Sequence, residues 1–186
     1  MNREENGETN LEKYREYLRL LAQLQLDQQL QGKIDLSGVV QQTMLEAYQH
    51  LEKKTNKKEG LVAWLRRILA NNLFDEIRKL KTEKRNVNRE RSIDAAIEHS
   101  SSRLQAWLVD EHTSPSGHVD QQEKALQLSE ALAKLPDAQR EAVVLRHIQG
   151  LPLNQIAAEL GRSHAAVAGL LKRGLQHLRN QMQDWT

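Results

Sequence analysis

The feature that most constrains this chain's fold is the stretch from Leu135 to Arg179, where short apolar stripes alternate with glycine-centred turns. One stripe falls at i, i+3, i+4 and i+7, the spacing that turns one helical face to a core: Leu153, Ile156, Ala157 and Leu160. Gly161 follows at the point where a left-handed residue can end a helix, and Ser163 is a good N-cap for the next one. This order predicts a helix-turn-helix.

The helix after Gly161 combines an apolar stripe with a basic exposed flank. Its stripe is Val167, Leu170, Leu171, Leu175 and Leu178. From residue 160 to 183 there are four basic residues and no acidic one, a balance that suits a phosphate backbone. Recognition helices meet base edges with their N-terminal end. We therefore predict DNA contacts at Arg162, Ser163, His164, Ala165, Lys172 and Arg173. The alternative is that the two helices only pack against each other without binding DNA, and the excess of basic residues over 160–183 disfavours it.

Composition points to an all-α protein made of two small helical domains joined by a linker. The chain has 186 residues and only 4% aromatics, and strong helix formers dominate it. It contains no cysteine, no HExxH pattern and no glycine-rich phosphate loop, so we predict no catalytic residue, no metal site and no cofactor. The polar N-terminus does not resemble a signal peptide, and no apolar run reaches membrane-spanning length. We expect a cytoplasmic protein without membrane insertion.

Charge is distributed in blocks along the chain. Residues 1–52 carry 5 Lys/Arg and 9 Asp/Glu, residues 53–91 carry 13 and 5, and residues 92–135 carry 3 and 7. Two basic blocks separated by an acidic one suggest two nucleic-acid surfaces and a spacer. The acidic N-terminal block is left for a partner other than DNA.

The elements before the helix-turn-helix follow from periodicity and from turn residues. We expect a helix from Leu11 to about Leu30, a second one capped by Asp35 or Ser37, and a third from Leu61. The Asn71–Asn72 pair has poor helix propensity and predicts a kink or short turn before a fourth helix. The region from about Val87 to Val119 predicts a linker with short helical pieces at 93–97 and 104–109. Trp107 indicates that this segment docks on a domain.

Three pieces of the chain, in order, resemble the extracytoplasmic-function type of sigma factor, a member of the sigma-70 family. DLSGVVQQTMLEAY is similar to that family's DxxDLVQETFLRAW helix, AWLRRILANNLFDEIRK to its WLxRIARNxxxDxxRR stretch, and LPDAQREAVVLRHIQGLPLNQIAAELGRSHAAV to its C-terminal domain. The resemblance implies a disordered N-terminus at 1–10, a region 2-like domain at 11–90, a linker at 91–122 and a region 4-like helix-turn-helix domain at 123–183.

The resemblance implies a factor that binds core RNA polymerase and directs promoter recognition and melting. Its partners would be the β′ clamp helices and β flap of the polymerase and promoter DNA, and an anti-sigma factor remains an open possibility. The polymerase surface would consist of Asp35, Val40, Gln41, Gln42, Met44, Leu45 and Glu46. The minus-ten element would meet Arg66, Arg67, Asn71, Asn72, Arg78 and Lys79, with Asn71 near a base flipped out of the duplex.

The recognition helix departs from the family pattern, and two alternatives remain open. Where relatives often have Thr-Val-Lys-Ser-Arg-Leu this chain has residues 166–171 as AVAGLL, so two usual cations are missing. One alternative is a helix-turn-helix regulator that is not a polymerase subunit, which would leave the Asp35 helix and the Asn71 stretch without a purpose. The other is an interaction protein with a degenerate DNA reader.

Overall fold

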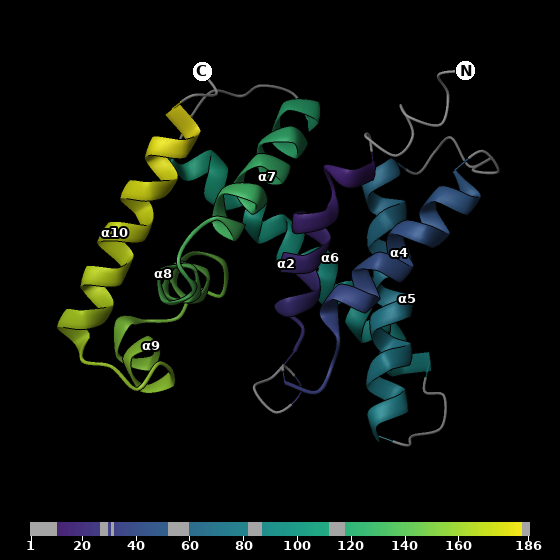
Figure 1. Ribbon diagram of the computed structural model, residues 1–186, viewed down its shortest axis with the longest axis horizontal. Coiled ribbons are helices and arrows are strands. Elements are labelled where there is room, and N and C mark those ends of the chain that lie inside the picture. Colours follow the sequence, from purple (N-terminus) through teal and green to yellow (C-terminus); the bar gives the residue numbers. More distant parts are fainter. Residues whose placement is uncertain are drawn as a thin grey trace. The chain divides into compact units, whose positions relative to one another are not determined.

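The computed structural model describes residues 11–26, 30, 32–51, 60–81, 87–111 and 118–183, and these residues form helices and turns without a strand (Figure 1). The prediction of an all-α fold is confirmed. The expected disorder of residues 1–10 and the lysine-rich turn at 52–59 lie outside the described residues.

The chain divides into two compact units, Met1–Ser101 and Ser102–Thr186. The division falls inside one helix, α6 (Val87–Glu111). Where the sequence predicted two short helical pieces within a linker, the structure has this single helix instead. Residues up to Ser101 belong to unit 1 and those from Ser102 onward belong to unit 2.

Unit 1 is built from α2 (Arg15–Gln23), α4 (Leu36–His50), α5 (Leu61–Lys81) and the start of α6. Figure 1 shows α4 crossing α5, and both helices also pack on α2. The Asp35 side chain caps α4, since its Oδ1 accepts a hydrogen bond of 3.0 Å from the Gly38 amide. Fully buried leucines and a tyrosine fill the centre of the unit: Tyr17, Leu18, Leu21, Leu65, Leu69 and Leu73.

The break predicted at Asn71 and Asn72 does not occur, because α5 runs through both residues. Ala70 and Leu73 on either side are buried in the core of unit 1. Asn72 also gains a partner, since its Nδ2 donates to Thr43 Oγ1 of α4 at 3.2 Å. Packing and this hydrogen bond outweigh the low helix propensity of two consecutive asparagines, which amounts to well under ~1 kcal/mol per residue.

Unit 2 contains the end of α6 followed by α7 (His118–Ala133), α8 (Asp137–Val143), a π-helical turn η1 (Val144–Ile148), α9 (Leu153–Glu159) and α10 (His164–Gln183). Its reader portion is organised around a cluster of Leu145, Ile156, Ala157 and Val167. The predicted helix-turn-helix is confirmed. Gly161 has φ +59°, and Ser163 Oγ accepts from the Ala166 amide at 3.2 Å, so the expected turn and N-cap are both present.

Helix α10 passes very close to α8 at Gly174. A Cβ atom built on Gly174 would lie 2.8 Å from Val143 Cγ2 and 3.5 Å from the Gln139 carbonyl oxygen. Real side chains essentially never approach so closely, so the absence of a side chain at 174 lets the two helices meet.

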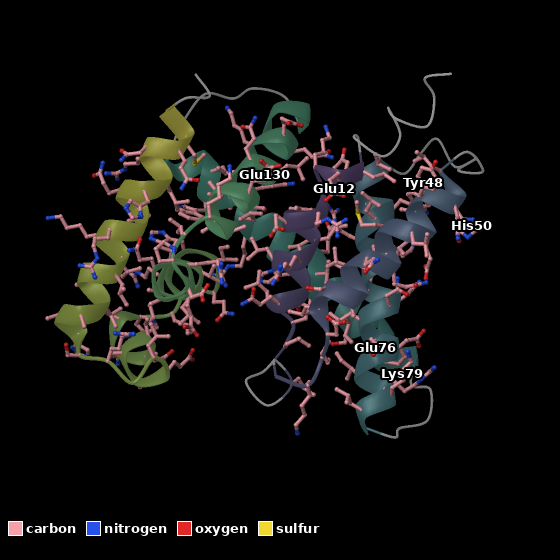
Figure 2. The ribbon with its side chains drawn as sticks, viewed as in Figure 1. Glu12, Tyr48, His50, Glu76, Lys79 and Glu130 are labelled. Atoms are coloured by element: carbon pink, nitrogen blue, oxygen red, sulfur yellow. The ribbon has the colours of Figure 1, made fainter. Side chains whose placement is uncertain are left out.

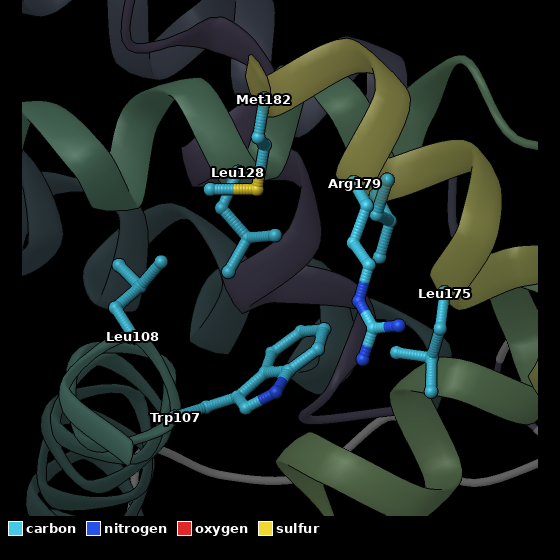
Figure 3. A pocket seen from close by; sticks show the side chains of 7 residues that line it. Trp107, Leu108, Leu128, Leu175, Arg179 and Met182 are labelled. Carbon is cyan, nitrogen blue, oxygen red and sulfur yellow. The ribbon is translucent and has the colours of Figure 1, made fainter. Parts of the chain in front are cut away.

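Trp107 is docked within unit 2, as its presence in the expected linker suggested. Its side chain is 9% exposed, and its ring stacks on His147 with the centroids 4.8 Å apart and the planes inclined by 19°. Figure 3 shows the indole beside a small pocket of about 20 Å³, together with Leu108, Leu128 and Arg179.

Candidate functional site

The exposed face of α4 carries two large apolar side chains that border a surface groove. Leu45 is 49% exposed and Tyr48 is 39% exposed, although both are apolar enough to be buried in most proteins. The groove has a volume of about 630 Å³, and its walls come from α4 and from the first described residues of unit 1: Leu11, Glu12, Arg15, Gln41, Met44, Leu45 and Tyr48. Such a combination of apolar and polar groups suits a protein partner.

Two residues that the sequence assigned to the polymerase surface are largely buried in unit 1, and Met44 also lines the groove. Val40 is 2% exposed and Met44 is 9% exposed. Both belong to the apolar stripe that holds α4 on the core, so Val40 is not available to a partner, whereas Met44 still lines the groove. The helical spacing of these apolar residues also predicts that they pack in the core. The sequence alone did not distinguish this packing role from a contact with the polymerase.

The polar members of the predicted polymerase surface remain accessible or take part in local bonds. Gln41 is exposed and lines the groove. Gln42 Nε2 donates to Glu46 Oε1 at 2.8 Å, an i,i+4 pair on the helix surface. Asp35 is occupied by its capping bond and fixes the start of α4.

An ion pair that the sequence analysis did not assign lies at the edge of the groove. The Arg15 guanidinium hydrogen-bonds the Glu12 carboxylate and thereby holds the pKa of Glu12 below its usual range. Figure 2 labels Glu12 and Tyr48, which belong to the two walls of this groove.

The sequence contained a signal that Tyr48 belongs to the groove, since positions 41, 45 and 48 share one helical face.

Arg66, predicted as a phosphate contact, is instead held inside unit 1. Its Nη2 pairs with Glu98 of α6 at 2.6 Å, and its Nη1 donates to Tyr17 Oη at 3.2 Å and to Ser101 Oγ at 3.3 Å. Burial by itself lowers the pKa of Arg66, but the tyrosine and the carboxylate more than compensate, so that the pKa is raised. This guanidinium links three helices of unit 1 and is not presented to DNA in this structure.

Two asparagines that were predicted together are placed differently by α5. Asn71 is exposed, whereas Asn72 is half-buried and bonded to Thr43. Thr43 is itself fully buried, and its hydroxyl donates to the Val39 carbonyl at 2.8 Å. The exposed amide of Asn71 can therefore contact a base edge, whereas the hydrogen-bonded amide of Asn72 holds α5 against α4.

The remaining cations of α5 lie along its surface, some of them beside carboxylates of the same helix. Arg67 is exposed. Arg78 pairs with Asp75 at 3.2 Å, and Lys79 pairs with Glu76 (Figure 2). Two cations that follow α5 in the sequence, Lys84 and Arg85, lie outside the described residues.

The predicted DNA-reading residues of unit 2 share the exposed side of α10 and the turn before it. All six are exposed: Arg162, Ser163, His164, Ala165, Lys172 and Arg173. The Arg173 guanidinium is folded back toward the N-terminal end of the helix, because its Nη1 lies 3.2 Å from the point where a Cβ on Gly169 would be. It therefore lies one turn closer to the reading end than its backbone position indicates.

The described residues lack a metal site and a membrane-spanning helix. No group of three or more histidine, aspartate or glutamate side chains is arranged to hold a metal ion. No described helix is long and apolar enough to cross a membrane.

Two families match this chain, each within one of its units. Sigma-70 region 2 matches residues 14–83, and Sigma-70 region 4 matches residues 125–178. The first match covers α4 and α5, and the second covers the helix-turn-helix. A regulator that uses only the helix-turn-helix would leave the region 2 match unexplained, which disfavours that alternative.

Several known proteins are similar to this chain over most of its length. The ECF RNA polymerase sigma factor SigW of Bacillus subtilis is 26% identical over 81% of this chain and 76% of its own length. The RNA polymerase sigma-E factor of Streptomyces antibioticus is 29% identical over 81% of this chain and 72% of its own. A solved structure of the sigma factor RpoE with the anti-sigma factor NepR from Bartonella quintana is 21% identical over 94% of this chain and 95% of that chain, with a TM-score of 0.35.

The family matches account for both units in the order that the sequence motifs predicted, and the relatives extend the likeness across the region between them. This chain belongs to the sigma-70 family of RNA polymerase sigma factors, in its extracytoplasmic-function type.

Proposed function

We propose that this sigma factor binds core RNA polymerase through the α4 groove, contacts the minus-ten element through α5 and reads the minus-thirty-five element through α10. The observation that carries the proposal is the presence of regions 2 and 4 on separate units, each with its own accessible surface. We assign the chain no catalytic residue.

The polymerase contact is argued from exposed apolar area. Leu45 and Tyr48 would bury their rings and methyl groups on a partner, while Gln41 would supply hydrogen bonds beside them. Burial of apolar surface contributes about 25 cal/mol per Å², so two side chains of this size can carry a substantial share of an interface.

A pull-down of core polymerase by the full chain tests this contact. Leu45→Glu places a charge at the centre of the groove and should abolish retention. Gln49→Glu is the matched control, because it adds the same charge to an exposed position of α4 that does not line the groove. Equal retention by both variants would remove the groove from the interface.

Promoter opening would depend on Asn71 rather than on Asn72. An amide donates and accepts in one plane, as a base edge requires, and Asn71 is the exposed member of the pair. Asn71→Ala should lower open-complex formation while polymerase binding stays intact. Permanganate footprinting would detect this as weaker reactivity of the melted thymines. Unchanged reactivity would leave Asn71 without a role in melting.

Two residues of α10 would contribute differently to binding of the minus-thirty-five element, one by a phosphate contact and the other by a base contact. Arg173 would meet a phosphate, so Arg173→Ala should weaken all promoter variants about equally and reduce the slope of log affinity against log salt by roughly one. His164→Ala should instead change the preference among sequences with that slope intact, because one hydrogen bond to a base discriminates at the lower end of ~1–3 kcal/mol. The opposite result would mean that α10 enters the groove the other way round.

A further inference from the structure

We propose that Arg103 of α6 is a positioning residue for the DNA reader, which acts by holding the turn that precedes α9. Arg103 does not itself belong to the reading surface. Residues 102–111 fall in neither family match, which cover 14–83 and 125–178, so the known regions do not account for this segment. The inference rests on the proposed function of α10.

The Arg103 guanidinium lies directly on the turn formed by Gln149 and Gly150. Its Nη1 donates to the Gln149 carbonyl oxygen at 3.0 Å. Gly150 has φ +73°, and a Cβ built there would lie 2.3 Å from Arg103 Nη2. The guanidinium thus occupies the space that any side chain at residue 150 would need.

The turn is a suitable place for a cation because it ends a helix. Gln149 is the C-cap of η1, where carbonyl groups lack helical partners and the helix dipole favours positive charge. A second guanidinium serves the same turn, since Arg146 Nη1 donates to the Leu151 carbonyl oxygen at 3.1 Å. Two carbonyl groups, two residues apart, are therefore each bonded to an arginine.

Arg103 is itself fixed by the packing of the following turn of α6. Leu104 is fully buried, and Trp107 stacks on His147 of η1. Trp107 and Leu108 also line the small pocket shown in Figure 3, beside Leu128 of α7. A guanidinium anchored in this way resists displacement more than one on a free helix.

The turn determines where α9 begins, and α9 in turn supports α10. Leu151 follows the turn and packs against the apolar cluster that contains Ile156 of α9 and Val167 of α10. The end of α9 then leads through Gly161 directly to the reading residues. Loosening the turn should therefore shift the reading residues without removing a group that touches DNA.

The test compares the full-length Arg103→Met variant with wild type by two measurements. Amide hydrogen exchange should become faster over residues 149–156, where the turn and the start of α9 lie. Affinity for a minus-thirty-five duplex should fall about fivefold, because DNA binding must then supply the ordering of the turn that a hydrogen bond worth roughly 1 kcal/mol supplies in wild type. The salt slope of binding should stay unchanged, and Arg103→Lys, which keeps one donor, should recover part of the affinity.

Lys134→Met is the matched control, because it removes one positive charge from an exposed position of unit 2 that belongs neither to the turn nor to the reading residues. Unchanged exchange together with unchanged affinity in Arg103→Met would overturn the inference. A salt slope lowered by about one with exchange unchanged would also overturn it, since Arg103 would then meet a phosphate itself. Faster exchange in a protein whose wild type binds no such duplex would support the hold on the turn and defeat the proposed function.

Discussion

A pair of identical substitutions in α10 should change the stability of unit 2 in opposite directions. Gly174→Ala adds a methyl group that would lie 2.8 Å from Val143 Cγ2, and Val143 is fully buried and cannot move aside freely. Overpacking of this kind costs about 1–3 kcal/mol, while alanine in a helix interior regains roughly 1 kcal/mol relative to glycine. The variant should therefore be about 0–2 kcal/mol less stable than wild type.

Gly169→Ala is the control within the same helix. Its added methyl group would meet only the flexible end of Arg173, whose Nη1 lies 3.2 Å away and can shift by a few tenths of an ångström. The propensity gain should dominate and make this variant about 0.5–1 kcal/mol more stable than wild type.

Native-state hydrogen exchange of the slowest amides in α8 and α10 measures the free energy of unfolding of unit 2 within the intact chain. We expect the two variants to differ by about 0.5–3 kcal/mol. Equal stability, or a more stable Gly174→Ala, would refute the argument that the contact between α8 and α10 requires a glycine.

Four further substitutions address unit 1. Asn72→Ala should lower its free energy of unfolding by about 1 kcal/mol through the lost bond to α4, whereas Asn71→Ala should stay within roughly 0.5 kcal/mol of wild type by native-state exchange. Arg66→Met should destabilise the unit by about 1–3 kcal/mol yet leave the salt slope of promoter binding unchanged; a reduced slope would contradict its internal placement. Arg15→Gln should raise the pKa of Glu12 toward its usual value in an NMR titration. Because the pKa of Glu12 is lowered in the folded state, the ion pair stabilises the protein at pH values above the ordinary pKa of a glutamate. This contribution is lost as the pH falls through the lowered pKa. It amounts to a few tenths of a kcal/mol at most, since both side chains are largely exposed.

The sequence was sufficient to predict the elements whose signals are local. The turn at Gly161 and the cap by Ser163 each depend on a few adjacent residues, and both were predicted; for the α4 cap the sequence left Asp35 and Ser37 open, and the structure has Asp35. Apolar periodicity likewise located the helix-turn-helix, because the spacing of a helical face is written directly in the residue order.

The errors arose where distant contacts decide the outcome. The continuity of α5 through Asn72 depends on Thr43, which lies 29 positions earlier. The fate of Arg66 depends on Tyr17, Glu98 and Ser101, and no local pattern distinguishes a cation that pairs internally from one that faces solvent. Charge counting therefore overstated the number of cations that α5 offers to DNA.

The carboxylates beside the α5 cations have a consequence for how binding responds to salt. Asp75 and Glu76 pair with Arg78 and Lys79, so a phosphate that meets either cation displaces an attached carboxylate rather than a mobile anion from solution. Release of free counterions is what makes nucleic-acid binding steeply salt-dependent. The carboxylate that is set free takes up a cation of the kind that the phosphate releases, so fewer ions enter solution. The affinity of this face for DNA should therefore vary less with ionic strength than the net charge of +8 over residues 53–91 would suggest.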